Sequence, residues 1–210
     1  LVMENCLDSR VWRPLKSKSE VPRSDLFEML YMGTATHNTD LDMVLPALDK
    51  LAQTYPGSFR LTVIGVASEM PERQWITKLS QSESIYPSFV SWFLRQGPFD
   101  IGLAPLVDNE FNKSKSDIKC LDYLAAGILP VVSDIKPYQA ARELSEVVIK
   151  VGNSIDQWTT ALLDLMVKDA SATKLRSARV FRGRKYLWSK RSSASTSTLL
   201  LKQLESLMEK

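Results

Sequence analysis

Short apolar segments alternate with amphipathic segments over most of the chain. Residues 60–66 (RLTVIGV) form a β-branched run, which is typical of a strand buried on both faces of a parallel sheet. Residues 40–56 repeat leucine and valine every three or four positions, which is the period of a helix with one buried side. The chain therefore carries strand and helix signals in alternation.

This alternation predicts a doubly wound α/β domain with a parallel sheet and right-handed crossovers. The expected strands are residues 26–33, 60–66, 75–80, 99–106, 129–134 and 147–151. The expected helices are residues 40–56, 86–96, 115–127, 138–145 and 155–167, followed by a helical C-terminal region. Ligands of such sheets bind beyond the carboxyl ends of the strands. The loops after Met32, Val66, Leu106 and Val132 are therefore the expected binding loops.

Three regions are expected along the chain. Residues 1–25 are rich in proline, serine and charge and are interpreted as a linker that leads into the domain. Residues 26–168 form the Rossmann-like domain, and residues 169–210 form a C-terminal helical extension. Because the chain begins at Leu1 rather than at methionine, it is interpreted as a fragment of a longer protein.

The composition excludes several classes of protein. With 44% hydrophobic and 24% charged residues, the chain is typical of a soluble globular protein, and it has no apolar run that could span a bilayer. Two cysteines and one histidine predict neither a disulfide framework nor a metal site, which favours a reducing, cytoplasmic setting. The sequence contains neither a Walker-type loop nor a GxGxxG motif, so it gives no support to ATP or NAD binding.

Basic residues are concentrated near the C-terminus, although the net charge is only +3. Eight lysines and arginines lie between Lys174 and Arg191, and no acidic residue lies between Asp169 and Glu205. Such a block is typical of a solvated or interdomain helix face, of a peripheral contact with anionic lipid, or of a nucleic-acid patch.

Residues 113–134 (KSKSDIKCLDYLAAGILPVVSD) contain the candidate site. On a helix, the apolar residues of one arc are Ile118, Leu121, Leu124 and Ala125, and the opposite arc carries Ser116, Lys119, Asp122 and Tyr123. One interpretation is a solvated face with a Lys119–Asp122 ion pair. The alternative uses the helix N-terminus after a strand, where backbone N–H groups and the dipole favour an anion. Ser116 and Lys119 would then contact phosphate, and Asp122 would accept hydrogen bonds from a diol such as a ribose.

The same residues resemble a motif of the retaining "group 1" (family four) GT-B glycosyltransferases. The motif is [ST]-x-x-K-x-x-[ED]-Y-x-A-x-G before a Pro-Val-Val strand, and here it begins at Ser116 and ends at Gly127. Four further segments are similar to that family, namely ENCLDSRVWRP, YMGTATHNTDL, FDIGLAPL and KPY. The resemblance covers roughly residues 4–165.

The resemblance implies the Rossmann-like, donor-binding half of a GT-B enzyme. It implies that Ser116 and Lys119 hold the diphosphate of a nucleotide sugar and that Asp122 holds the ribose. It further implies that Gly33, Thr34 and His37 form the loop facing the phosphates and the transferred sugar, and that an acceptor (glycan, lipid-linked or protein) is held by an N-terminal domain that is missing here. No catalytic residue is assigned, no metal or cofactor is implied, and no nucleic-acid partner is expected. This piece alone is expected to bind donor but to transfer little or no sugar.

Two departures from the family pattern keep other functions open. Ser114 stands where the family has a glutamate, and the loop after Gly33 lacks the usual arginine and lysine. Lys113 and Lys115 are the candidates for restoring that charge. The departures favour an alternative, a non-catalytic interaction module on a degenerate GT-B fold. The other alternative is a membrane-surface or nucleic-acid binder that uses the basic block 174–191.

Overall fold

A single parallel sheet organises the protein. The computed structural model describes residues 4–12, 25–33, 38–65, 72–81, 85–139 and 142–208. Within these residues six strands form one sheet in the order β3-β2-β1-β4-β5-β6, and every neighbouring pair is parallel. The strands are β1 (Phe27–Met32), β2 (Phe59–Ile64), β3 (Ile76–Leu79), β4 (Ile101–Ala104), β5 (Leu129–Ser133) and β6 (Ile149–Val151). The predicted doubly wound α/β fold is confirmed.

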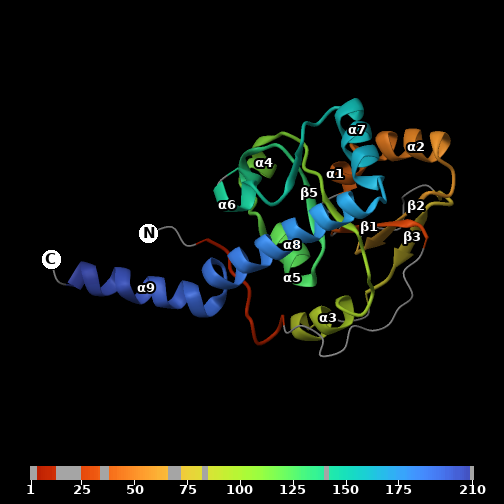
Figure 1. Cartoon of the computed structure of the whole chain (residues 1–210). Coiled ribbons are helices and arrows are strands. Elements are labelled where there is room, and N and C mark those ends of the chain that lie inside the picture. Colours follow the sequence, from red (N-terminus) through yellow and green to blue (C-terminus); the bar gives the residue numbers. More distant parts are fainter. Residues whose placement is uncertain are drawn as a thin grey trace.

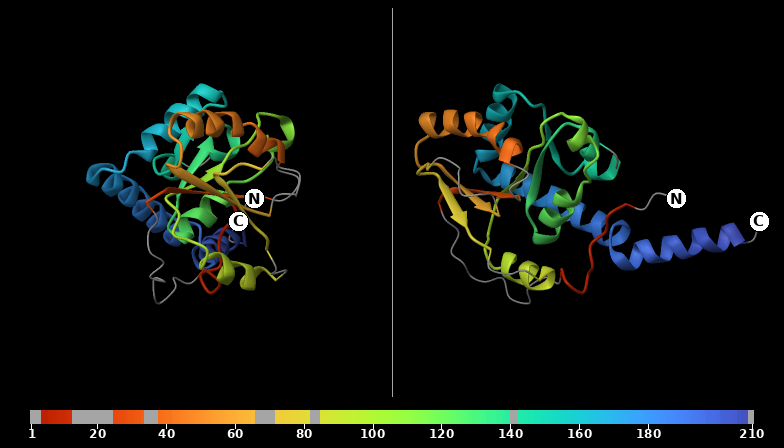
Figure 2. Two further views of the ribbon diagram at one scale, coloured as in Figure 1. Left: turned by 90° about the vertical axis from the view of Figure 1, so that its right-hand side faces the viewer. Right: turned by 180° about the vertical axis from the view of Figure 1, so that it is seen from behind.

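Helices cover both faces of the sheet (Figures 1 and 2). Successive side chains of a strand point to opposite faces, so β1 contributes Met29 and Tyr31 to one core and Leu30 and Met32 to the other. The first core lies under α1 (Asn38–Asp42), α2 (Leu45–Thr54) and α7 (Ile155–Met166), and the second lies under α3 (Tyr86–Phe93), α5 (Ile118–Ala126), α6 (Arg142–Ser145) and α8 (Ala170–Lys190). Both faces of the sheet are therefore shielded from water, as the apolar side chains of the strands require.

Three predicted helices differ from the observed ones. Residues 40–56 form two helices, α1 and α2, because Pro46 lies in the first turn of α2 and proline is tolerated there but not inside a helix. The segment 138–145 is the short 3₁₀ helix η2 (Lys136–Tyr138) followed by α6. The segment 115–127 becomes helical only at Ile118. The loop after β4 contains a short helix that was not predicted, α4 (Glu110–Lys113).

The N-terminal segment of the described chain contacts the residues that follow α8. The segment 4–12 pairs with the break between α8 and α9 (Ser193–Met208), where Leu7 N–H donates to the carbonyl of Arg191 and Ser193 N–H donates to the carbonyl of Leu7. Beyond this contact α9 extends away from the body of the domain (Figure 2). None of the described helices is long and apolar enough to cross a membrane.

Part of the basic block 174–191 serves the fold. Arg176 donates to the carbonyl of Leu165 (2.8 Å) at the end of α7, and Arg179 donates to the carbonyl of Glu146 (3.2 Å) just after α6. Cations are favourable at these positions, because the last carbonyls of a helix have no partner within it and carry partial negative charge. The interpretation of the block as one solvated face therefore holds for only some of its residues.

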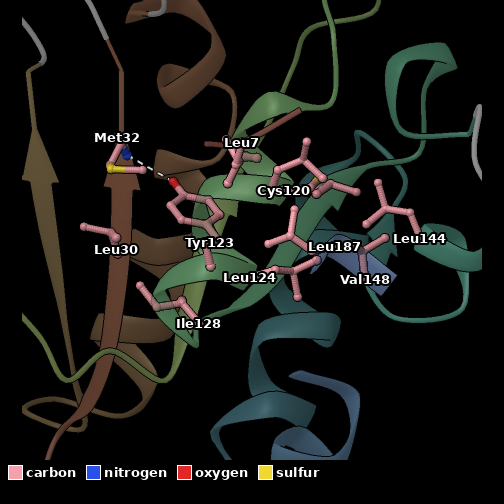
Figure 3. Packing of buried hydrophobic residues seen from close by; sticks show 14 of the residues in the cluster. Leu7, Leu30, Met32, Cys120, Tyr123, Leu124, Ile128, Leu144, Val148 and Leu187 are labelled. Atoms are coloured by element: carbon pink, nitrogen blue, oxygen red, sulfur yellow. Dashed lines mark hydrogen bonds between the residues drawn. The ribbon is translucent and has the colours of Figure 1, made fainter. Parts of the chain in front are cut away.

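Tyr123 joins the two strands that separate at the switch in strand order. The pairing of β1 with β4 ends at Tyr31 and Leu103. The Tyr123 hydroxyl lies at that point, accepting from the N–H of Met32 (3.1 Å) and donating to the carbonyl of Leu103 (2.9 Å), as Figure 3 shows in part. Its ring lies so close to Gly102 that a Cβ there would be 2.6 Å away. The helical-wheel prediction that Tyr123 lies on a polar face was wrong, because the sheet and α8 contact α5 on two sides and Tyr123 is fully buried.

We expect Tyr123→Phe to lower the free energy of unfolding by about 1–3 kcal/mol, because it leaves a buried N–H and a buried C=O without their partner. Urea unfolding followed by circular dichroism would measure the change. Tyr55→Phe is the matched control, since Tyr55 is 43% exposed and should change stability little. Equal stability of Tyr123→Phe and the wild type would contradict the bridging role.

Candidate functional site

A cavity opens at the carboxyl end of the sheet, between the end of β4, the start of α5 and η2. Its volume is about 280 Å³, and it is lined by Leu106, Lys115, Ser116, Ile118, Lys119 and Tyr138. Three of the predicted site residues, Lys115, Ser116 and Lys119, therefore lie together. Ile118 begins α5, so the positive end of the helix dipole adjoins the cavity.

Lys119 lines this cavity and carries a buried ammonium. Its Nζ has less than 1 Å² of exposed surface and no hydrogen-bond partner in the part of the chain that the structure describes. The Nζ lies 5.1 Å from the ring centroid of Tyr31. Burial lowers the pKa of Lys119 to about 8, although the charge of Asp40 opposes that shift. A solvated face with a Lys119–Asp122 ion pair is therefore the wrong interpretation of this helix.

Asp122 lies one turn further along α5 and does not line the cavity. Its Oδ1 is also buried and has no hydrogen-bond partner among the described residues. Burial raises the pKa of Asp122 to about 7, and the charge of Lys119 counteracts part of that shift. A buried carboxylate oxygen without a donor is costly, so this position suits a ligand that supplies a hydroxyl.

Ser116 stands at the mouth of the cavity and is exposed. Its Oγ accepts a hydrogen bond from the side-chain amide of Asn5 at 2.6 Å. A serine hydroxyl has one proton to donate. With a lone pair occupied by Asn5, that proton is available to an acceptor such as a phosphate oxygen in the cavity.

A buried carboxylate, Asp40, binds Lys115 and the loop after β4, and sequence reasoning missed it. Asp40 is 1% exposed and accepts from the N–H of Val107 (2.9 Å), from the amide of Asn112 (2.7 Å) and from the ammonium of Lys115 (3.3 Å). A signal was present, because Asp40 lies on the apolar stripe that continues through Val44. Asn112 carried no comparable signal.

Of the remaining predicted site residues, Gly33 is described by the structure. Gly33 lies at the end of β1, where its N–H donates to Ile64 and its carbonyl approaches Gly65 so closely that a Cβ there would be 2.5 Å away. Thr34 and His37 lie outside the described residues.

The structure also shows the positions of Ser114, which departs from the family pattern, and of Lys113 and Lys115, the candidates for the missing positive charge. Lys115 lines the cavity, whereas Lys113 binds Asp108 (3.3 Å) and Glu110 (3.0 Å) and does not line it. Ser114, which replaces the family glutamate, donates to the carbonyl of Phe111 and ends α4. Within the described ranges no group of three or more His, Cys, Asp or Glu side chains could hold a metal ion.

Comparison by sequence finds no relative, since no family profile and no curated protein matches the chain. Comparison by structure finds many solved chains with a similar fold. WaaG, a glycosyltransferase involved in lipopolysaccharide biosynthesis, matches with a TM-score of 0.64 at 15% identity over 94% of this chain and 54% of its own. A trehalose-6-phosphate synthase, from a study of glycosyl transfer with retention, matches with a TM-score of 0.68 at 15% identity over 97% of this chain and 51% of its own.

A glycosyltransferase from Rickettsia africae matches with a TM-score of 0.70 at 14% identity, over 99% of this chain and 57% of its own. At such identities the similarity concerns the fold. The chain thus has the α/β Rossmann-like fold of the GT-B glycosyltransferases, as the Ser116–Gly127 motif predicted, and it spans about half the length of the solved chains that it matches.

Proposed function

We propose that the cavity binds the diphosphate of a nucleoside-diphosphate sugar and that the chain is the donor-binding half of a retaining glycosyltransferase. Ser116, Lys119 and the N-terminus of α5 hold the diphosphate. Lys115, which lines the same cavity, adds a second cation. Asp122 accepts from the ribose hydroxyls, and the loop that starts at Gly33 faces the transferred sugar.

The observation that carries this proposal is the buried ammonium of Lys119, which has no hydrogen-bond partner among the described residues. A buried charge without a partner destabilises a fold, so it persists where a ligand of opposite charge completes it. The cavity places that ammonium beside a helix N-terminus and a serine hydroxyl, which are the donors that a phosphate needs. Asp122, buried one turn away, matches a neutral diol rather than a second phosphate.

One structural neighbour supports the choice of ligand. The structure of a trehalose-6-phosphate protein from E. coli bound with UDP-2-fluoro glucose matches with a TM-score of 0.61 at 16% identity, over 85% of this chain and 44% of its own. In transfer from such a donor the leaving diphosphate gains charge, and fixed cations and helix dipoles stabilise it most. Lys119 and α5 fill that role here without a metal, and the acceptor binds to a part of the enzyme outside this chain.

The rival to this function is a non-catalytic interaction module on the same fold. Ser114 supports it, because the hydroxyl that replaces the family glutamate is engaged in ending α4. Donor binding separates the two, since a degenerate module has no reason to keep a nucleotide site.

A first prediction concerns Lys119→Met. Calorimetric titration with UDP, GDP and their sugar conjugates should show binding by the wild type and a loss of about thirty- to a hundredfold in the variant, since a charge-assisted contact to phosphate is worth about 2–3 kcal/mol. Lys50→Met is the control, because Lys50 pairs with Asp156 at the surface and lies outside the cavity. A Lys119→Met protein that binds these ligands like the wild type would refute the assignment.

The same variant should be more stable without ligand. A methionine of similar length removes a buried charge, so the midpoint of thermal unfolding should rise by a few degrees, on the order of 1 kcal/mol or more. Loss of binding through misfolding would lower that midpoint instead, and calorimetry distinguishes the two results.

A further prediction concerns pH. Binding of a UDP sugar should be nearly constant from pH 7 to pH 8 and should weaken above the Lys119 pKa of about 8, because the neutral amine no longer attracts the diphosphate. The loss should approach about tenfold per pH unit. Protonation of Asp122 below its pKa of about 7 should weaken binding at acid pH. Lys119→Met should remove the alkaline limb and Asp122→Asn the acid limb. A pH-independent affinity in the wild type would count against both roles.

A second function is favoured by the outer face of α8. Lys174, Arg182 and Lys185 are exposed there, beside Phe181 (72% exposed) and Leu175 (56% exposed). Cations mixed with large apolar side chains suit an anionic bilayer surface more than a nucleic acid, because the apolar groups can enter the headgroup region.

Sedimentation with vesicles of phosphatidylglycerol and phosphatidylcholine tests this function. Replacing Lys174, Arg182 and Lys185 with serine should weaken binding to anionic vesicles roughly a hundredfold, at about 1 kcal/mol per charge. Replacing Lys50, Arg60 and Lys78, which are exposed elsewhere, is the control. Lys119→Met should bind vesicles like the wild type. Undiminished vesicle binding by the α8 variant would exclude this surface.

A further inference from the structure

The N-terminus of α5 lacks the side-chain cap that its sequence leads one to expect. Asp117 occupies the N-cap position, and aspartate there normally accepts from a backbone N–H of the first turn. Asp169 does so at the start of α8, accepting from Ala172 N–H at 2.6 Å. Asp117 makes no such bond. The same residue type in the same position thus behaves differently in α5, which is the helix beside the cavity.

Two features set Asp117 apart from Asp169. The backbone ψ of Asp117 is 13°, whereas Asp169 has the extended ψ of 163° that is usual for a capping residue. The carboxylate of Asp117 is also bound by Arg191, whose two terminal nitrogens donate to its two oxygens, each at 2.8 Å. Both residues are buried, since Arg191 is 3% and Asp117 8% exposed. A bidentate pair of this kind engages both carboxylate oxygens and fixes their orientation away from the helix end.

The position of Arg191 is itself fixed by the segment that precedes the sheet. Its Nε donates to the carbonyl of Asn5 at 2.7 Å, and its own carbonyl accepts from the N–H of Leu7. The side chain of Asn5 in turn donates to the Ser116 hydroxyl. One arginine thus orients both polar residues that precede Ile118.

A capping carboxylate would compete directly with a phosphate. It would take the free N–H groups of the first turn, and its charge would repel an anion in the cavity and offset the charge of Lys119. Among the described residues the Lys119 ammonium has no hydrogen-bond partner, although the charge of Asp40 favours its protonated form. We propose that Arg191 is a positioning residue that keeps the N-terminus of α5 open for the diphosphate by holding the Asp117 carboxylate away from it. This inference rests on the donor site proposed above.

The test compares nucleoside-diphosphate binding by Arg191→Met with binding by the double variant Arg191→Met/Asp117→Ala. In the single variant Asp117 is free to cap α5, and affinity for UDP or GDP should fall by about tenfold. In the double variant no carboxylate remains, and affinity should return to within about threefold of the wild type. Because removing one partner of a buried ion pair destabilises a fold more than removing both, binding is compared only between variants that thermal unfolding shows to be folded. A folded double variant that binds as poorly as the folded single variant would show that the carboxylate is not the cause. That result, or unchanged binding by Arg191→Met, would overturn the proposal.

Two controls accompany the titrations. Arg176→Met removes another α8 arginine that binds backbone carbonyls, and it should leave the affinity within about twofold of the wild type. The double variant replaces a whole buried ion pair with apolar groups and is expected to fold. If Arg191→Met alone does not fold, Arg191→Lys takes its place, because lysine keeps the charge but cannot hold both carboxylate oxygens. Thermal unfolding of every variant confirms that it is folded.

A structure of Arg191→Met, or of Arg191→Lys in its place, separates this inference from the donor assignment. The Asp117 carboxylate should then accept from the N–H of Lys119, the second residue of α5, since the N–H of Cys120 already donates to the Asp117 carbonyl. If it stays away from the helix end, the role of Arg191 is refuted even where nucleotide binds. If the wild type binds no nucleoside diphosphate, the donor assignment fails, and the position of Asp117 still decides whether Arg191 keeps the helix end open.

Discussion

The hydroxyl of Tyr123 is the contact on which the site depends. At the switch in strand order β1 and β4 must separate, which leaves a buried N–H on one strand and a buried carbonyl on the other. The hydroxyl satisfies both, because it accepts from Met32 and donates to Leu103. Since Tyr123 belongs to α5, the same contact fixes the helix relative to the sheet. Ser116, Lys119 and Asp122 take their positions from that helix.

Two ionisable side chains of the site are buried in electrostatically unfavourable positions. Lys115 is compensated by Asp40, which also binds Asn112 and the backbone of Val107. Lys119 and the Oδ1 of Asp122 are buried without hydrogen-bond partners in the described chain. Their pKa values shift in the directions expected for groups that lose water, downward for the lysine and upward for the aspartate. Lys115 is thus held by a protein contact, and the two groups without one are those on which the proposed donor site rests.

The sequence predicted the sheet and the helix beside the cavity, but not the contacts around that cavity. Apolar runs of strand length identify buried strands whatever surrounds them, and the motif at Ser116 identified the helix beside the cavity. Tyr123 was misassigned because a helical wheel assumes one buried side, whereas α5 contacts the sheet and α8 on two. Asp40 was missed because its neighbours in space lie about seventy residues away in the chain. Contacts between residues so distant in the sequence produce no periodic pattern in it.

The contacts of the basic block 174–191 could not be predicted from the sequence either. Composition gives the number of charges but not the groups that each side chain contacts, and here Arg176 and Arg179 compensate the negative ends of α7 and α6. Arg191 has a different task, because it binds the carboxylate at the positive end of α5 rather than a row of carbonyls. Helix ends in contact with these arginines are thus closed by the protein itself. The start of α5 has no side-chain cap, and it is the end that adjoins the cavity and the buried lysine.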